Sequence, residues 1–120
     1  MLVYQETRTQ DIRSALDARR AELAEEYAAA VAEMTLAGTA DSGDDVADLG
    51  TKAFNREQEF ALAVSIRNRM EQVERALERL DAGYYGTCET CREEIPVARL
   101  AAFPSVTLCV RCKSRSEHRH

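Results

Sequence analysis

The four cysteines constrain this chain most strongly, because their spacing predicts a metal site. Two residues separate Cys88 from Cys91 and Cys109 from Cys112, and seventeen residues lie between the pairs. Each Cys-x-x-Cys turn can direct two sulfurs at one ion, and two turns complete a tetrahedron of thiolates. Zinc held in this way has no open position for a substrate. We therefore expect one structural zinc ion and no catalysis there.

Other uses of paired cysteines are less favoured. The chain begins Met-Leu-Val-Tyr and then turns polar, without the basic start and apolar run of a secretory signal, so we expect a cytoplasmic protein with reduced thiols rather than disulfides. A redox dithiol of the thioredoxin type uses a single Cys-x-x-Cys in a β-α-β unit, and no alternation of strands and helices is visible. Four thiolates could also bind iron, which the residues alone leave open.

The composition favours long exposed helices over a globule with a thick core. Among 120 residues, 31% are charged and only 6% are aromatic. No stretch approaches the roughly eighteen apolar residues of a membrane-spanning helix. The net charge of −5 argues against a protein that coats nucleic acid, although residues 89–120 carry six basic and four acidic side chains, a local net charge of +2.

Two segments have the periodicity of long helices. The first covers about residues 9–37 and is expected to close at Gly38; the second covers about residues 46–82 and is expected to close at Gly83. The apolar stripe of the first segment contains Ile12, Leu16, Leu23, Tyr27, Ala30 and Met34. The heptads of the second are Ala63, Met70 and Leu77 in one register and Ile66, Val73 and Leu80 in the other, with Leu49, Ala53 and Phe60 expected to continue the stripe.

Two such helices joined by a short turn must pack antiparallel, because neither apolar stripe can stay in water. The predicted fold is mostly α-helical: a long antiparallel two-helix coiled-coil hairpin in residues 1–82, then a small C-terminal four-cysteine zinc finger with a short terminal helix in residues 83–120. The finger is too small to fold on an apolar core alone, so zinc should supply most of its stability. Short helices are expected around residues 98–100 and from residue 110.

Acidic residues gather in the turn between the helices, residues 38–48. Asp41, Asp44, Asp45 and Asp48 fall within eight residues, with no basic residue among them. Capping explains one or two of them, since Asp45 suits the N-cap and Asp48 the first turn of the second helix. Alternatively, carboxylates at the end of a long hairpin could reach a metal ion or basic groups inside a narrow pore. The residues alone do not decide between these readings.

An acidic turn, a coiled-coil stem and a four-cysteine finger together resemble the DksA/TraR family of bacterial RNA-polymerase-binding regulators. The resemblance covers residues 40–113 and is most specific in the finger, whose knuckles read Tyr-Gly-Thr-Cys-Glu-Thr-Cys (85–91) and Leu-Cys-Val-Arg-Cys-Lys (108–113). Arg92 stands where the family usually has glycine. The family motif Asp-x-x-Asp-x-Ala is matched by Asp45 and Asp48, with Gly50 in place of alanine.

The resemblance implies a transcription regulator and not an enzyme. The finger and the base of the hairpin would dock on RNA polymerase, and the hairpin would insert into the secondary channel. There Asp45, Asp48 and Gly50 would approach the active centre and alter the stability of promoter complexes. The resemblance implies no sequence-specific DNA binding by the protein itself. We expect a monomer.

Some family members share a site for the alarmone ppGpp with the polymerase, formed by basic residues of the second helix and the finger. In an ungapped alignment those positions are Gln72, Phe103 and Lys113, and only Lys113 is basic. Each charge-assisted hydrogen bond contributes about 1.5–3 kcal/mol, so we expect a weak ppGpp response or none. Arg99 and Lys113 are the candidate contacts to polymerase or nucleotide.

Two rival functions are compatible with the sequence. One is a zinc-dependent protein–protein adaptor, in which the hairpin only spaces or dimerises the finger. The other is a DNA-binding finger that uses Lys113, Arg115 and Arg119. An enzyme is least favoured, because His118 and His120 lie in a polar tail and no nucleophile set, phosphate loop or open metal site is visible.

Overall fold

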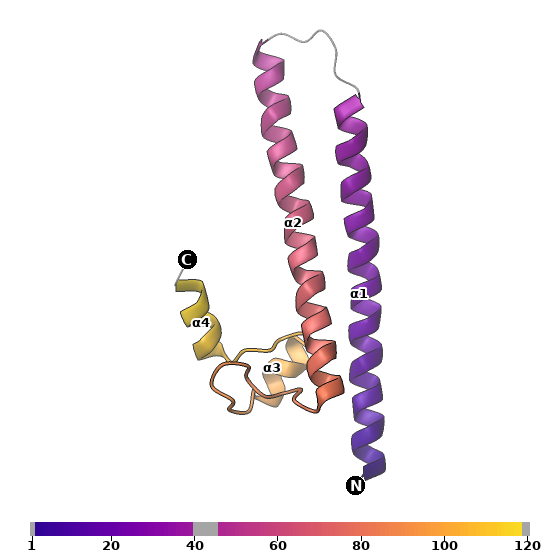
Figure 1. The fold of residues 1–120 in the computed structure, drawn as a ribbon, viewed down its shortest axis with the longest axis vertical. Coiled ribbons are helices and arrows are strands. Elements are labelled where there is room, and N and C mark those ends of the chain that lie inside the picture. Colours follow the sequence, from indigo (N-terminus) through magenta and orange to yellow (C-terminus); the bar gives the residue numbers. More distant parts are fainter. Residues whose placement is uncertain (1, 40–45, 119–120) are drawn as a thin grey trace. The chain divides into compact units, whose positions relative to one another are not determined.

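The computed structural model describes the backbone of residues 2–39 and 46–118, with side chains for residues 8–35 and 50–118. Within these ranges it contains the helices α1 (Leu2–Thr39), α2 (Val46–Ala82), α3 (Val97–Ala102) and α4 (Val110–His118), shown in Figure 1. The described residues form no strand, only an isolated antiparallel bridge between Thr87 and Glu94. None of their helices is long and apolar enough to cross a membrane. The predicted fold class is confirmed.

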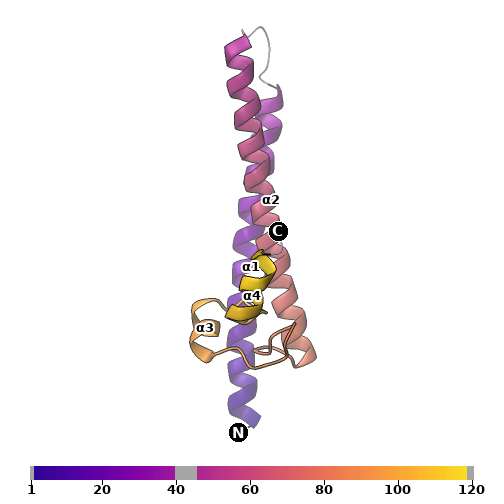
Figure 2. The ribbon, with the colours of Figure 1, turned by 90° about the vertical axis from the view of Figure 1, so that its left-hand side faces the viewer.

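The chain packs as two compact units. The first comprises residues 1–20 and 71–120, and the second comprises residues 21–70. Within each unit α1 and α2 run side by side in opposite directions, as Figures 1 and 2 show from two sides. The first unit also contains α3, α4 and the loops between them. The division at residue 83 that the sequence suggests stays a prediction.

The bounds of α1 differ from the predicted ones at both ends. The helix begins at Leu2 rather than near residue 9, because residues 2–8 contain neither glycine nor proline. It also runs through Gly38 to Thr39, so Gly38 does not close it as expected. One glycine inside a helix costs only about 1 kcal/mol, which a long helix tolerates.

The predicted acidic turn falls mostly outside the described residues. Asp41, Asp44 and Asp45 lie outside them, and the side chain of Asp48 is not described although its backbone belongs to α2. The proposed capping roles of Asp45 and Asp48 therefore stay predictions. Gly50 is described and exposed within α2.

The predicted stripes form the cores of both units, and the buried leucines contribute about 1.5–3 kcal/mol each. Met70 is half-buried, and Ala76, which the heptads did not include, is fully buried. The residues of α1 and α2 that are buried in the first unit are Leu16, Val73, Ala76, Leu77 and Leu80. Buried in the second are Leu23, Ala30, Ala63 and Ile66. Two of these four are alanines, so the described part of the second unit has the thinner core.

The expectation that Ala53 and Phe60 continue the stripe of α2 is wrong, and the side chain of Leu49, the third residue expected there, lies outside the described residues. Both are exposed, Phe60 to 60%, while Lys52 and Glu59 are half-buried. Stepping back from Ala63 by heptad spacing reaches residues 59 and 52, so the seam continues through polar side chains. One carboxylate oxygen of Glu59 is buried without a hydrogen-bond partner among the described residues. This polar seam further weakens the packing of the second unit.

Phe60 instead lines an open apolar groove within the second unit. The groove has a volume of about 370 Å³ and lies between the two helices of that unit. Its other lining residues include Tyr27, Val31, Met34 and Val64. Phe60 is therefore beside the core rather than part of it.

The end of α2 is closed by glycine as predicted. Gly83 has φ +85°, its N–H donates to the carbonyl of Leu80 (3.2 Å), and the N–H of Tyr84 donates to the carbonyl of Arg79 (2.8 Å). This pair of bonds is the Schellman arrangement, which satisfies carbonyls that a helix end leaves unpaired. The turn directs the chain from α2 into the four-cysteine region.

Gly50 and Gly83 should respond in opposite ways to alanine. A Cβ added at Gly50 meets no atom within 4 Å, so Gly50→Ala should raise the free energy of unfolding of α2 by about 1 kcal/mol. Gly83→Ala should lower it by about 1 kcal/mol, because its positive φ strains any residue with a Cβ. Hydrogen exchange of α2 peptides measures both changes. Equal effects of the two substitutions would contradict this account.

Candidate metal centre

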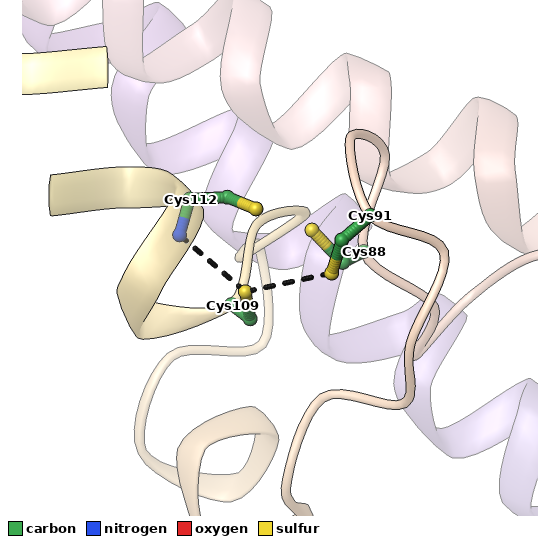
Figure 3. Close-up of side chains that lie close together, drawn as sticks. All are labelled: Cys88, Cys91, Cys109 and Cys112. Atoms are coloured by element: carbon green, nitrogen blue, oxygen red, sulfur yellow. Dashed lines mark hydrogen bonds between the residues drawn. The ribbon is translucent and has the colours of Figure 1, made fainter. Parts of the chain in front are cut away.

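The four cysteines of the sequence motif converge on one point. Figure 3 shows the four side chains close together. Their sulfurs all lie within 4.8 Å of one another, and those of Cys91 and Cys109 are 3.8 Å apart. A tetrahedral site with Zn–S bonds of about 2.3 Å has sulfur–sulfur edges of about 3.8 Å. All four are free thiols, which excludes the pair of disulfides in this structure. The donor set and its spacing fit one zinc ion.

Backbone hydrogen bonds shape the first knuckle. The N–H of Cys88 donates to the carbonyl of Glu93 (2.8 Å), and the N–H of Arg92 donates back to the carbonyl of Cys88 (3.0 Å). Gly86 accepts a bond from the N–H of Ile95 (2.8 Å) and has φ +88°. These bonds form a tight loop that places the sulfurs of Cys88 and Cys91 on one side.

The second knuckle is the start of α4. The N–H of Lys113 donates to the carbonyl of Cys109 (2.9 Å), and the N–H of Cys112 donates to the sulfur of Cys109 (3.4 Å). The first helical turn therefore brings Cys112 back over Cys109. The helices predicted near residues 98–100 and from residue 110 are confirmed as α3 and α4.

The environment of the thiols favours a charged form at some of them. Burial raises the pKa of Cys88, but backbone hydrogen bonds from Cys109, Cys91 and Thr90 outweigh it and lower the pKa to about 6. A hydrogen bond with Cys109 and burial raise the pKa of Cys112 to about 12. The thiols thus share their protons unequally. A zinc ion held by these four sulfurs would displace the remaining protons, because a coordinating thiol is deprotonated.

A small apolar cluster lies beside the sulfurs. Cys88, Ile95 and Cys112 are buried, and partly buried apolar side chains pack against them: Leu100, Val106, Leu108 and Cys109. So small a cluster cannot order a loop-rich segment by itself. We therefore expect the metal to be the main source of stability here, and this expectation from the sequence stays a prediction.

Polar side chains fasten the finger in ways that the sequence did not reveal. Arg79 of α2 donates to the carbonyl of Thr87 (2.8 Å), and the hydroxyl of Tyr85 donates to the carbonyl of Pro104 (2.8 Å). Burial raises the pKa of Tyr85, opposed by the nearby Arg8 guanidinium. Gln72 also bonds to the finger. Heptad spacing gave no signal for these contacts, because they join residues between 8 and 35 positions apart.

The remaining predicted site residues have simpler surroundings. The Nε of Arg99 donates to the carbonyl of Leu108 (3.2 Å), so this side chain connects two segments within the finger. Lys113 is exposed and forms an ion pair with Glu117 at 3.9 Å. Gly50 lies in the other unit, and neither Asp45 nor the side chain of Asp48 is described.

The finger matches a known family model. Residues 83–118 match the model of the prokaryotic dksA/traR C4-type zinc finger. The chain is 35% identical over 113 residues to the RNA polymerase-binding transcription factor DksA of Haemophilus influenzae, an alignment that covers 89% of this chain and 72% of that protein. The chain belongs to the DksA/TraR family. The family model also favours zinc over iron as the metal of the four thiolates, because it describes a zinc finger.

Two further relatives define how far the similarity extends. The structure of DksA2 from Pseudomonas aeruginosa matches 95% of this chain and 86% of its own, with a TM-score of 0.78 and 29% identity. DksA of Escherichia coli is 35% identical over 68 residues, only 45% of its length. The names of these proteins describe transcription factors and not enzymes, in agreement with a metal site that has no open position.

Arg92 occupies a backbone position that favours glycine. Its φ is 65°, and it is the only residue other than glycine with a positive φ in the described part of the chain. The family usually has glycine at this position. In the structure the consequence is backbone strain, because a residue with a side chain in the left-handed region costs about 1–2 kcal/mol.

Arg92→Gly should therefore stabilise the finger. We expect a gain of up to about 1 kcal/mol, since the relieved strain exceeds the extra chain entropy that glycine loses on folding. Zinc-loaded protein with and without the substitution can be compared by chemical denaturation and by hydrogen exchange at residues 88–95. Arg111→Gly, at an exposed helical position, is the control and should destabilise α4. A less stable Arg92→Gly finger would refute this explanation.

Proposed function

We propose that this protein is a transcription regulator that acts by binding RNA polymerase. The observation that carries the proposal is the similarity of both parts of the chain, hairpin and finger, to a protein named RNA polymerase-binding transcription factor DksA. A finger similarity alone would suit many zinc-dependent adaptors. The alignment with the H. influenzae protein covers 89% of this chain and so includes most of the two long helices.

The proposed mechanism assigns different tasks to the two ends of the hairpin. The finger and the adjoining helix ends dock on the polymerase, and the hairpin enters the secondary channel. Asp45 and Asp48 then approach the active centre and change the stability of promoter complexes. Residues 1–88 carry a net charge of −7, the total of −5 less the +2 of residues 89–120. This charge disfavours DNA as the binding partner.

The finger has surface features that suit a protein partner. Val97, Phe103 and Val110 are each more than 60% exposed. Exposed apolar side chains contribute to protein interfaces when a partner covers them. Arg99 and Lys113 add positive charge to the same segment and remain our candidates for polymerase contacts. We also propose that the protein acts as a monomer in the cytoplasm, where thiols stay reduced.

The ppGpp response should be weak or absent. Of the three aligned positions, Gln72 uses its amide within the protein, Phe103 carries no charge, and Lys113 already pairs with Glu117. A multiply charged phosphate would therefore meet one cation instead of three. Each missing charge-assisted hydrogen bond forfeits about 1.5–3 kcal/mol of binding.

Neutralising the turn tests the proposed mechanism. Asp45→Asn combined with Asp48→Asn should abolish the effect on transcription in vitro, while polymerase still copurifies with the variant, because docking uses the finger. Glu25→Gln combined with Glu26→Gln, which neutralises two exposed carboxylates in the middle of α1, is the control and should leave transcription unchanged. If the double variant regulates normally, the hairpin is only a spacer and the protein is better described as an adaptor.

The nucleotide proposal has its own test. Adding ppGpp to a polymerase complex at an rRNA promoter should change transcription to the same extent with and without this protein, and Lys113→Ala should have no further effect. The readout is the ratio of transcripts with and without ppGpp. A strong enhancement by the protein that disappears in Lys113→Ala would overturn this part of the proposal.

A further inference from the structure

A series of polar contacts connects Gln72 of α2 to the finger. The Nε2 of Gln72 donates to the carbonyl of Ser105 (2.8 Å) and to the hydroxyl of Thr107 (3.0 Å). Thr107 is only 4% exposed. One amide group thus satisfies a backbone carbonyl and a buried hydroxyl in the loop that leads to Cys109.

Further polar contacts connect this loop to the first knuckle and the first knuckle to α2. The hydroxyl of Thr107 donates to the carboxylate of Glu89 (2.7 Å), which forms an ion pair with Arg75 at 3.8 Å. A backbone bond from the N–H of Glu89 to the carbonyl of Thr107 (2.9 Å) runs alongside. Gln72 and Arg75 are three residues apart and share a face of α2. Gln72, Thr107, Glu89 and Arg75 therefore form a closed loop of contacts, the polar ring.

The buried member of the ring makes its removal costly. The hydroxyl of Thr107 accepts one bond and donates another, so both functions of this buried group are used. Losing Gln72 would leave the hydroxyl and the carbonyl of Ser105 without their donor. An unpaired buried polar group costs more than the net gain of the bond it replaces, and linked bonds strengthen one another.

Two members of the ring adjoin the metal ligands. Glu89 follows Cys88 directly, and Thr107 precedes Cys109 by two residues. An ion that joins Cys88 to Cys109 keeps Glu89 and Thr107 at bonding distance, and the Glu89–Thr107 contacts in turn keep the two cysteines together. Gln72 and Arg75 extend this mutual support to α2.

We propose that Gln72 is a positioning residue that couples zinc binding to the placement of the finger on α2. Zinc orders the two knuckles, the ordered knuckles complete the polar ring, and the ring holds the finger on the helix. Because such coupling is reciprocal, a broken ring weakens zinc binding even though no ligand has changed. The inference concerns the first unit alone and does not depend on the proposed action on polymerase.

The test removes the donors of Gln72 in two ways in the full-length protein. Gln72→Glu keeps the shape and replaces the amide by an acceptor, and Gln72→Met removes both donors without adding charge. Gln58→Glu makes the same chemical change at an exposed position of α2 in the other unit and is the matched control. Helical circular dichroism of each variant confirms that α1 and α2 are intact.

Two measurements read out the coupling. Competition with a chromophoric chelator should show zinc affinity lowered about two- to tenfold in both Gln72 variants, the equivalent of one net hydrogen bond, and unchanged in Gln58→Glu. Hydrogen exchange of peptides that contain the Glu89 amide should accelerate in the zinc-loaded Gln72 variants only. Gln72→Met combined with Thr107→Val should cost less than the sum of the single changes, because both break the same ring.

Three results would overturn the inference. If Gln72→Met binds zinc as tightly as the unmodified chain, Gln72 is not coupled to zinc binding. A loss in Gln72→Glu without a loss in Gln72→Met would assign the effect to charge near the metal instead of to hydrogen bonding. Strict additivity of Gln72→Met and Thr107→Val would show that the two side chains act independently.

Discussion

The convergence of four sulfurs is the constraint on which the finger depends. Residues 83–118 contain two short helices, an isolated bridge and a small apolar cluster, which cannot supply the free energy to order that many residues. With a metal bound, Cys88 and Cys109 are fixed together, and the loops around them acquire defined partners. The hydrogen bonds from Arg79 and Gln72 of α2 to the finger can form only when those loops are in place.

The two units differ in how their helices are held. In the first, α1 and α2 bury leucine and valine side chains, and an ion pair between Arg13 and Asp81 joins the two helices at the surface. In the described part of the second, two alanines are buried beside Leu23 and Ile66, and the seam of α2 then passes through Glu59 and Lys52, while Phe60 lies outside it. A polar, thin seam separates more easily than a leucine seam. Among the described residues, the packing between α1 and α2 is thus weaker in the second unit, whose sequence includes the acidic turn.

The metal site could be predicted almost completely, because ligand spacing is a local property. A Cys-x-x-Cys turn determines where its sulfurs point, and two such turns in a short chain have few alternatives. The stripe of α2 was predictable from Ala63 to Leu80 for a similar reason, since apolar residues repeat there at heptad spacing. The prediction failed at Phe60. Its apolar side chain suggested a core residue, but the helical register places Glu59 in the seam instead.

The sequence by itself determined the helices, their antiparallel pairing, the zinc ligands and the family, because these follow from short-range spacing and from motifs. Only the tertiary structure decided that Gln72 contacts Thr107, that Glu89 joins both knuckles to Arg75, and that Arg92 adopts a left-handed backbone. Contacts of this kind join residues far apart in the chain, and a polar side chain in a sequence does not reveal which distant group will satisfy it.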